Sequence, residues 1–218
     1  GNQLATLKIE TVAAYCRRAG VPYQTVARAF DVDREPRPAG PNHFGPKGAF
    51  DLRIDGWLQA DGSVSANRFP VPETFLGRVD NALVIPPQFS VVTEENTALL
   101  EGLFYHTPAR LNVGPCFAIM APDNRILAEL PSSSENHDVE AVLIGGSQNY
   151  YHCLLDWFSR LSVIAANPAL ADMPLVVSAN MPAAAVEFIR LLGMEGNRLI
   201  TLSDQPARFA KLWLPSLA

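Results

Sequence analysis

The pattern of apolar and polar positions divides the chain into three parts, of which the first is short and mixed. Its apolar residues recur at helical spacing, at Leu4, Leu7, Val12 and Tyr15. With Gly20 as a stop, this pattern predicts two short helices, the second starting near Tyr23. The stretch 31–50 holds four prolines and three glycines, which sustain neither a helix nor a central strand. We therefore expect a helical segment followed by a linker over residues 1–50.

The second part, residues 51–135, changes to short apolar runs separated by turn residues. The clearest runs are ALVI (82–85), FSVVT (89–93), TALLEG (97–102) and FAIMA (117–121). Turn signals lie between them at Pro86-Pro87, at 94–96 and at 122–124. This spacing predicts an antiparallel meander or paired hairpins, with APDNRILAEL as the clearest hairpin.

The third part, residues 136–218, alternates apolar strands with helical patterns. The segments are EAVLIGG, NYYHCLLDWFSRLSVIAAN, MPLVVSA, MPAAAVEFIRLLG, NRLITL and AKLWLPS. Such alternation predicts strand-helix-strand units and a parallel sheet. Asn180 is placed to cap the second helix and Gly193 to end it. Only SDQPARF separates the last two strands, which is short for a crossover helix. The fold class expected is α/β, with an appended antiparallel section.

One predicted helix, which follows Gly145 and Gly146, carries an unusual polar stripe. At about 100° per residue, its apolar side holds Leu154, Trp157, Phe158, Leu161 and Ala165. The opposite side holds Asn149, His152, Asp156, Ser159 and Arg160. This side has no Lys or Glu, and the side chains of His152 and Asp156, four residues apart, can meet. The stripe would face the crevice beyond the strand ends, where ligands bind in open parallel sheets. An ordinary wet surface with an incidental His–Asp pair explains the same geometry.

The motif N-Y-Y-H-x-L-x-D-x-x-x-R-L over residues 149–161, followed by PLVVS, LLG and LWLPS, resembles glycosyltransferase family 61, the capsular polysaccharide biosynthesis type. The resemblance covers residues 139–216, and an early YCxxxGxPY turn (15–23) is compatible with it. It implies a two-lobed, GT-B-like architecture in which 136–218 form a Rossmann-like lobe. It also implies a nucleotide-sugar donor as substrate, inversion at the sugar carbon, and no obligatory metal or cofactor.

Inversion by direct displacement needs a base that takes the proton of the acceptor hydroxyl. Asp156 is our first choice for that base and His152 the second. Asn149 and Arg160 are predicted to contact substrate, although Arg160 equally suits a structural pair with Asp156. Gly145 and Gly146 either let backbone approach a ligand or simply make the turn.

The net charge and the cysteine content indicate which partners and which cellular compartment to expect. The net charge of −5 opposes a polyanion partner, so we expect no nucleic acid. The segment TVAAYCRRAGVPYQTVARAF nevertheless resembles a helix-turn-helix, although Arg28 is the one clear DNA contact in its second helix. Three scattered cysteines and the lack of an eighteen-residue apolar run favour a cytoplasmic protein. The expected partners are a nucleotide sugar, a glycan acceptor and, peripherally, the membrane polysaccharide machinery.

Two further expectations concern activity. In a GT-B enzyme the donor nucleotide sits mainly on the second lobe, and this chain shows no basic, glycine-rich diphosphate loop. We therefore expect the chain to be the amino-terminal part of the enzyme and inactive alone, because catalysis depends on holding two substrates together. A non-catalytic relative that binds sugars or assembles with a partner enzyme is the remaining alternative.

Overall fold

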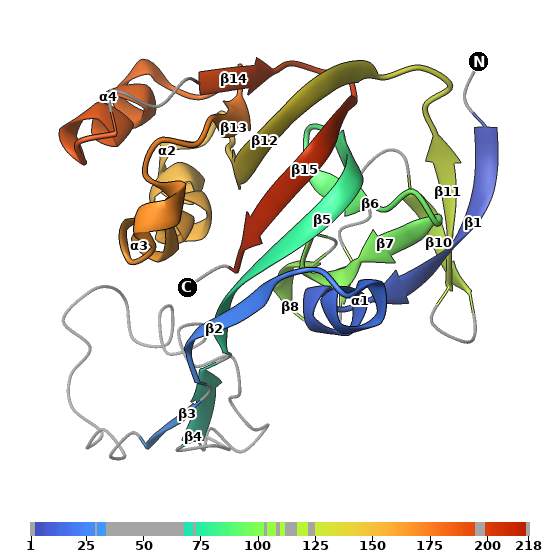
Figure 1. Cartoon of the computed structure of the whole chain (residues 1–218), viewed down its shortest axis with the longest axis horizontal. Coiled ribbons are helices and arrows are strands. Elements are labelled where there is room, and N and C mark those ends of the chain that lie inside the picture. The colour runs from blue at the N-terminus through green and yellow to red at the C-terminus, as the bar shows by residue number, and fades with distance from the viewer. Residues whose placement is uncertain are drawn as a thin grey trace, which may run out of the picture. The chain divides into compact units, whose positions relative to one another are not determined.

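The computed structural model describes residues 3–28, 30–33, 68–71, 73–102, 104–107, 110–111, 117–121, 125–194 and 199–216 (Figure 1). The protein is mixed α/β and divides into two compact units. The smaller unit, Ala27–Glu73, contains an antiparallel pair of strands, β3 (Phe30–Asp33) and β4 (Arg68–Val71). The larger unit combines Gly1–Val26 with Thr74–Ala218 and contains the candidate site.

Among the described residues, eleven strands of the chain form one sheet. Its antiparallel part is built from β1 (Gln3–Glu10), β2 (Tyr23–Ala27), β5 (Thr74–Ile85), β6 (Ser90–Val92), β7 (Thr97–Leu99), β10 (Phe117–Ala121) and β11 (Arg125–Leu130). The rest is β12 (Glu135–Gly145), β13 (Leu175–Ser178), β14 (Leu199–Leu202) and β15 (Ala207–Pro215). The strand order is β10-β11-β1-β7-β6-β5-β15-β12-β13-β14, and β2 also pairs with β5.

The two halves of this sheet run differently and meet at β15. The pairs β15–β12, β12–β13 and β13–β14 are parallel. On its other edge, β15 is antiparallel to β5. On the other side β1 with β11, β10 with β11, β5 with β6 and β6 with β7 are antiparallel, and β1 with β7 is parallel. The predicted parallel sheet in the last third and the predicted antiparallel strands before it are confirmed, and both belong to one continuous sheet. The β10–β11 hairpin pairing is also confirmed.

Helices connect the parallel strands. Between β12 and β13 lie α2 (Tyr150–His152), the π turn η2 (Cys153–Trp157), α3 (Ser159–Ala165) and the 3₁₀ turn η3 (Pro168–Leu170). Between β13 and β14 lies α4 (Ala183–Leu191). Figure 1 shows α2, α3 and α4 gathered beside this half of the sheet, away from α1 (Val12–Ala19). No helix in the described part of the chain has the length and apolarity needed to cross a membrane.

The remaining short elements follow β7. They are the 3₁₀ turn η1 (Leu100–Gly102) and the antiparallel pair β8 (Phe104–Thr107) and β9 (Arg110–Leu111).

The amino-terminal prediction of two helices is wrong. One helix forms, α1, and it ends at Gly20 with a φ of 68° as predicted. Residues 3–10 and 23–27 are strands, so the described part of this segment holds no second helix for a helix-turn-helix. Ala5, Leu7 and Ile9 alternate onto an apolar cluster beneath the antiparallel strands, whereas Leu4 is 64% exposed. The buried residues of this segment therefore recur at every second position, as in a strand, and the helical spacing of Leu4 and Leu7 is coincidental.

Three smaller predictions concern loops and caps. The N-cap of α4 is Pro182 rather than Asn180, whose N–H donates to Ser178 Oγ at 3.1 Å. Gly193 follows α4 with a φ of 76°, as a helix stop requires. The link from β14 to β15 contains no helix and joins strands separated in the sheet by β13 and β12. Residues 34–50 of the predicted linker and the turn at 122–124 lie outside the described residues.

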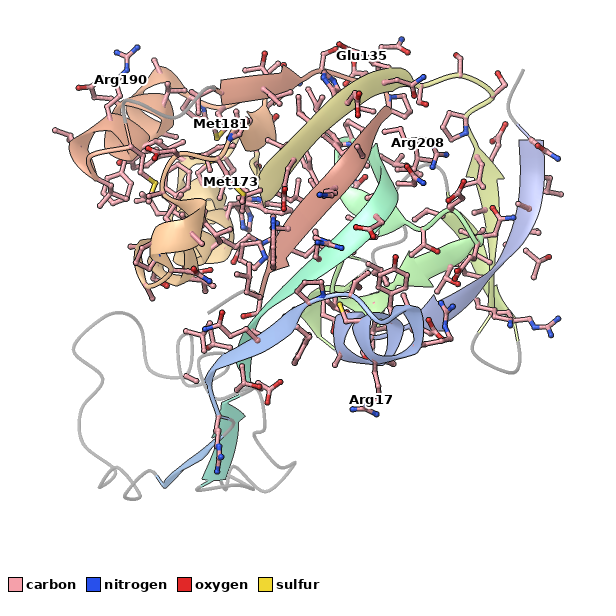
Figure 2. The ribbon with its side chains drawn as sticks, in the orientation of Figure 1. Arg17, Glu135, Met173, Met181, Arg190 and Arg208 are labelled. Atoms are coloured by element: carbon pink, nitrogen blue, oxygen red, sulfur yellow. The ribbon has the colours of Figure 1, made fainter. Side chains whose placement is uncertain are left out.

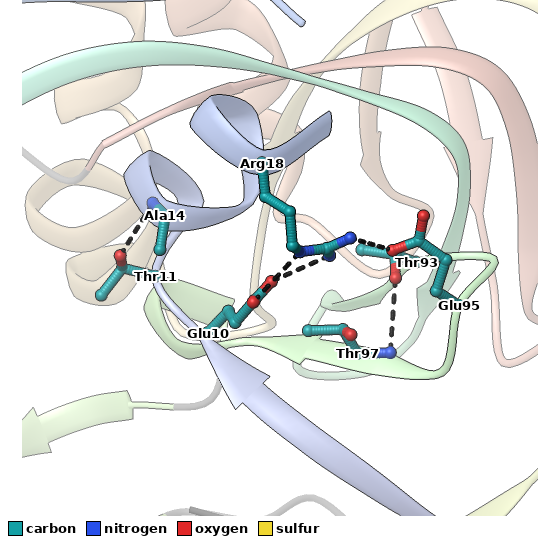
Figure 3. Close-up of polar contacts among 7 residues, drawn as sticks. All are labelled: Glu10, Thr11, Ala14, Arg18, Thr93, Glu95 and Thr97. Atoms are coloured by element: carbon teal, nitrogen blue, oxygen red, sulfur yellow. Dashed lines mark hydrogen bonds and ion pairs between the residues drawn. The ribbon is translucent and has the colours of Figure 1, made fainter. Parts of the chain in front are cut away.

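Polar contacts tie α1 to the antiparallel strands (Figure 3). Arg18 donates to both carboxylate oxygens of Glu10, at 3.2 and 3.0 Å, and to Glu95 at 2.6 Å. The Thr11 hydroxyl caps the helix by accepting from Ala14 N at 3.1 Å. Because the ion pairs are exposed, they stabilise the fold little. The packing of α1 is therefore set by its buried residues, among them Val12 and Cys16.

Gly77 of β5 lies directly beneath α1. A Cβ at this position would lie 2.4 Å from Val12 Cγ1 and 3.2 Å from Cys16 Sγ. We expect Gly77→Ala to lower the free energy of unfolding by roughly 1–3 kcal/mol, because the added methyl overpacks the interface. Urea denaturation followed by circular dichroism measures the change. In a Val12→Ala background the clashing atom is gone, so the same substitution should cost less; an undiminished cost there would refute the contact as its cause.

Candidate functional site

The candidate site begins where β12 ends, at a pair of glycines. Gly145 has a φ of 86° and Gly146 of 142°, a region that side chains disfavour. A Cβ on Gly145 would lie 2.5 Å from the Trp157 ring, and one on Gly146 would lie 2.7 Å from Met181 Cγ. Met181 is labelled in Figure 2 between α4 and β12. Backbone conformation and packing thus account for both glycines, which are buried. Their contact with a substrate stays a prediction.

Side-chain hydrogen bonds start the helix right after this turn. Asn149 caps α2, its Oδ1 accepting from Tyr151 N at 3.0 Å, while its own N–H donates to Ser147 Oγ at 3.1 Å. The Cys153 thiol donates to the Ser147 carbonyl at 3.0 Å, and burial raises its pKa. This cysteine is fully buried and packs in the core. The cap leaves Asn149 exposed and places His152 in the first turn after the strand.

A single widened turn follows and holds the candidate base. Phe158 N donates to the Cys153 carbonyl at 2.8 Å, an i to i+5 bond that makes Cys153–Trp157 a π turn. Asp156 lies inside this turn and His152 immediately precedes it. Single π turns within helices are rare and frequently occur at functional sites. The spacing of 100° per residue, which was used to assign the two sides of this helix, does not apply across such a turn.

The predicted meeting of His152 and Asp156 is confirmed. His152 Nδ1 lies 2.7 Å from Asp156 Oδ2, and the two side chains are 29% and 22% exposed. The carboxylate therefore fixes the ring orientation while both groups stay accessible to a ligand. Half-burial with a short hydrogen bond is the setting in which an imidazole–carboxylate pair accepts a proton from a bound hydroxyl. Among the described residues, no group of three or more His, Cys, Asp or Glu side chains is placed to hold a metal ion.

The rest of the stripe follows the prediction only in part. Trp157, Phe158 and Leu161 are buried on the apolar side, but Ala165 is exposed. Arg160 is only 5% exposed and does not belong to the polar stripe. Its Nη1 donates to the Ile144 carbonyl at 2.9 Å, and its guanidinium lies 5.0 Å from the centre of the Trp157 ring. The physical reason is the π turn together with a side chain long enough to reach the sheet.

The sequence analysis did not identify two tyrosines beside the His152–Asp156 pair as candidate site residues. Tyr150 and Tyr151 are 43% and 64% exposed, and the Tyr151 ring meets the His152 ring edge-on at 5.9 Å. Tyrosine, with an apolar ring and a polar hydroxyl, is a residue type enriched at interfaces. The available signal was their position in the motif, directly before His152.

The chain matches no protein-family model, no curated protein and no solved structure. Its function is therefore inferred from the geometry of its own residues.

The packing of Trp157 against Gly145 can be tested by comparing substitutions at two glycines with similar backbone conformations. Gly145→Ala places a methyl against Trp157, whereas Gly193, with a φ of 76°, has open space around its Cα. We expect Gly193→Ala to cost about 1 kcal/mol of unfolding free energy, from the backbone alone. Gly145→Ala should cost about 2 kcal/mol or more beyond that, from the added clash. Chemical denaturation measures both; equal costs would show that Trp157 does not press on this turn.

Proposed function

We propose that the chain belongs to an inverting glycosyltransferase that moves a sugar from a nucleotide-sugar donor to a glycan acceptor. The observation that carries this proposal is the His152–Asp156 contact of 2.7 Å, which joins the residue before a π turn to a residue inside it, on the helical segment after a parallel strand. The pair lies within the N-Y-Y-H-x-L-x-D motif on which the family resemblance depends.

The position of the pair in the sheet supports a ligand-binding role. Strands β12, β13 and β14 follow one another outward, whereas β15 lies on the other side of β12. The strand order thus reverses between β12 and β15, and open α/β sheets bind ligands beyond the carboxyl ends of their strands at such a reversal. His152 and Asp156 lie on the helical segment that follows the carboxyl end of β12. This arrangement favours a Rossmann-like lobe of a GT-B-like enzyme.

The proposed chemistry is a single displacement. The acceptor hydroxyl attacks the sugar carbon, its proton passes to the Asp156 carboxylate, and the nucleotide departs from the opposite face with the bonding electrons. His152 orients the carboxylate through their hydrogen bond, or takes the proton itself with Asp156 as its partner. The nucleotide sugar is a substrate, and the proposal assigns no step to a cofactor.

The surrounding residues take revised roles in this proposal. Asn149 is exposed beside the pair and keeps its proposed contact with substrate. Arg160 is buried, so we do not assign it to the developing phosphate charge. Tyr151 offers an aromatic face of suitable character for the apolar face of a sugar ring, because its ring is largely exposed next to His152.

Asp156→Asn keeps the shape of the side chain and removes its basic oxygen. We expect turnover by the native gene product to fall by roughly a hundredfold or more while donor binding is unchanged. Radiolabelled sugar transfer and calorimetric titration with a panel of nucleotide sugars measure the two quantities. The matched control is Asp172→Asn, an exposed carboxylate on the same crossover, which should transfer normally. Near-normal turnover by Asp156→Asn would remove Asp156 as the base.

A substitution of the exposed Tyr151 tests acceptor binding separately from the chemical step. Tyr151→Ala should raise the acceptor KM several-fold with little change in kcat, because the ring would bind ground state and transition state alike. Steady-state kinetics with varied acceptor measure both constants. If sugar binding persists while wild-type protein transfers nothing to any acceptor, the non-catalytic alternative, a sugar-binding relative, replaces the enzyme proposal.

A further inference from the structure

Arg160 is the only charged residue among the buried residues in the described part of the chain, with 5% of its surface exposed. Burial lowers its pKa to about 10, and no described carboxylate opposes this shift. The guanidinium therefore stays charged at neutral pH. A buried charge without a counter-charge is costly, and apolar side chains of similar volume often fill such a space more favourably. The presence of an arginine here must be explained by its contacts.

The guanidinium joins the end of β12 to the end of the π turn η2. Its Nη1 donates to the Ile144 carbonyl at 2.9 Å, and its central carbon lies 5.0 Å from the centre of the Trp157 ring. Ile144 is the last residue but one of β12, and Trp157 is the last residue of η2. Nε is buried without a hydrogen-bond partner among the described residues, which adds to the cost of an arginine at this position.

The Ile144 carbonyl lies where the pairing of β12 is irregular. In the pairing with β13 the register shifts between Leu143 and Gly145, so Ile144 has no partner in it. The described pairing with β15 ends at Val142. Arg160 thus supplies a donor to a fully buried residue at a point that the neighbouring strands do not pair. An apolar side chain at position 160 would remove this donor.

Trp157 is held by contacts on more than one side. Besides the guanidinium, the Phe89 ring meets it edge-on at 5.9 Å, and a Cβ on Gly145 would lie 2.5 Å from its ring. The residue is 6% exposed. Asp156 directly precedes Trp157 in the same π turn and contacts His152 at 2.7 Å. An indole that is fixed in place therefore fixes the backbone that carries Asp156.

We propose that Arg160 is a positioning residue for the His152–Asp156 pair. By joining the Ile144 carbonyl to the Trp157 ring, it fixes the π turn against the end of β12 and holds Asp156 within hydrogen-bond distance of His152. It acts through Trp157 and not by contact with a substrate. This role in the geometry of the pair does not depend on the proposed transferase activity.

The direct test reads the geometry of the pair by NMR and needs no substrate. An ionised Asp156 accepts from His152 Nδ1 only if that nitrogen carries the proton, and the ¹⁵N resonances of the imidazole show which nitrogen carries it. The His152 signals are those lost in His152→Gln. In Arg160→Met, at a pH where the ring is neutral, we expect the Nδ1-protonated tautomer to lose its dominance. The matched control is Leu7→Ala in the separate apolar cluster, which should lower stability and leave the tautomer unchanged.

Arg160→Lys separates positioning from packing. Lysine keeps the charge and a donor for the Ile144 carbonyl but loses the planar group that stacks on Trp157. It should therefore restore part of the tautomer balance that Arg160→Met loses. An unchanged tautomer in folded Arg160→Met, or a lysine variant no better than the methionine variant, overturns the proposal.

A measurement on the wild-type chain decides the question if Arg160→Met does not fold. If Arg160 joins the turn to the strand, the Phe158 N–H, which closes the π turn, should open only together with the end of β12. Its native-state hydrogen exchange should then lie within about tenfold of that of the Val142 N–H, which donates to the Pro174 carbonyl at 2.8 Å. Exchange at Phe158 about a hundredfold faster and independent of urea would show a turn that opens alone, and the proposal would fail.

A kinetic measurement rests on the proposed function as well. In the native gene product, Arg160→Met should lower kcat by roughly tenfold or more with little change in the donor KM, because positioning acts on the chemical step. A tautomer shift without a fall in kcat would refute the role of His152 and Asp156 in transfer and leave the positioning role standing. A fall in kcat with an unchanged tautomer would refute the positioning role.

Discussion

The architecture depends on β15 lying between β5 and β12. It is antiparallel to β5 from Ala207 opposite Val84 to Pro215 opposite Leu76, and parallel to β12 on its other side. Side chains at both edges strengthen these pairings: Trp213 Nε1 donates to Glu140 Oε1 at 2.8 Å, and Phe75 N donates to Ser216 Oγ at 3.0 Å. In the sheet of the described residues, β15 is the strand through which the parallel half pairs with the antiparallel half.

The pairing of β15 with β12 fixes the strand from which the candidate site is built. β12 is fixed between β15 and β13, so the position of Gly145 at its end is fixed too. The glycine turn accommodates Trp157, and the Asn149 cap starts the helix that carries His152. The turn is held by buried packing against Trp157, and the cap is a side-chain hydrogen bond to the backbone N–H of Tyr151. The His152–Asp156 pair therefore sits on preorganised structure, as a group that must meet a substrate in one geometry requires.

Sequence reasoning succeeded where one period dominates a long segment and failed where segments are short. Residues 136–216 alternate strand and helix clearly enough to predict the parallel sheet and the contact of His152 with Asp156. In residues 3–10, by contrast, Leu4 and Leu7 fit a helix face, and only the sheet shows that Ala5, Leu7 and Ile9 share one side. The π turn and the burial of Arg160 depend on tertiary packing, which no periodicity encodes. The family resemblance and the transferase activity stay predictions.

The position of β15 also has a consequence for biosynthesis. A ribosome releases β5 long before β15, and residues 86–206 must be made in between. At roughly 5–20 residues per second, the nascent chain carries β5 without its neighbour for on the order of ten seconds. Through that interval an edge rich in apolar residues such as Leu76 and Val79 lacks its partner, and unpaired edges invite association with other chains. Production of this protein should accordingly benefit from slow expression and from chaperones that shield nascent strands.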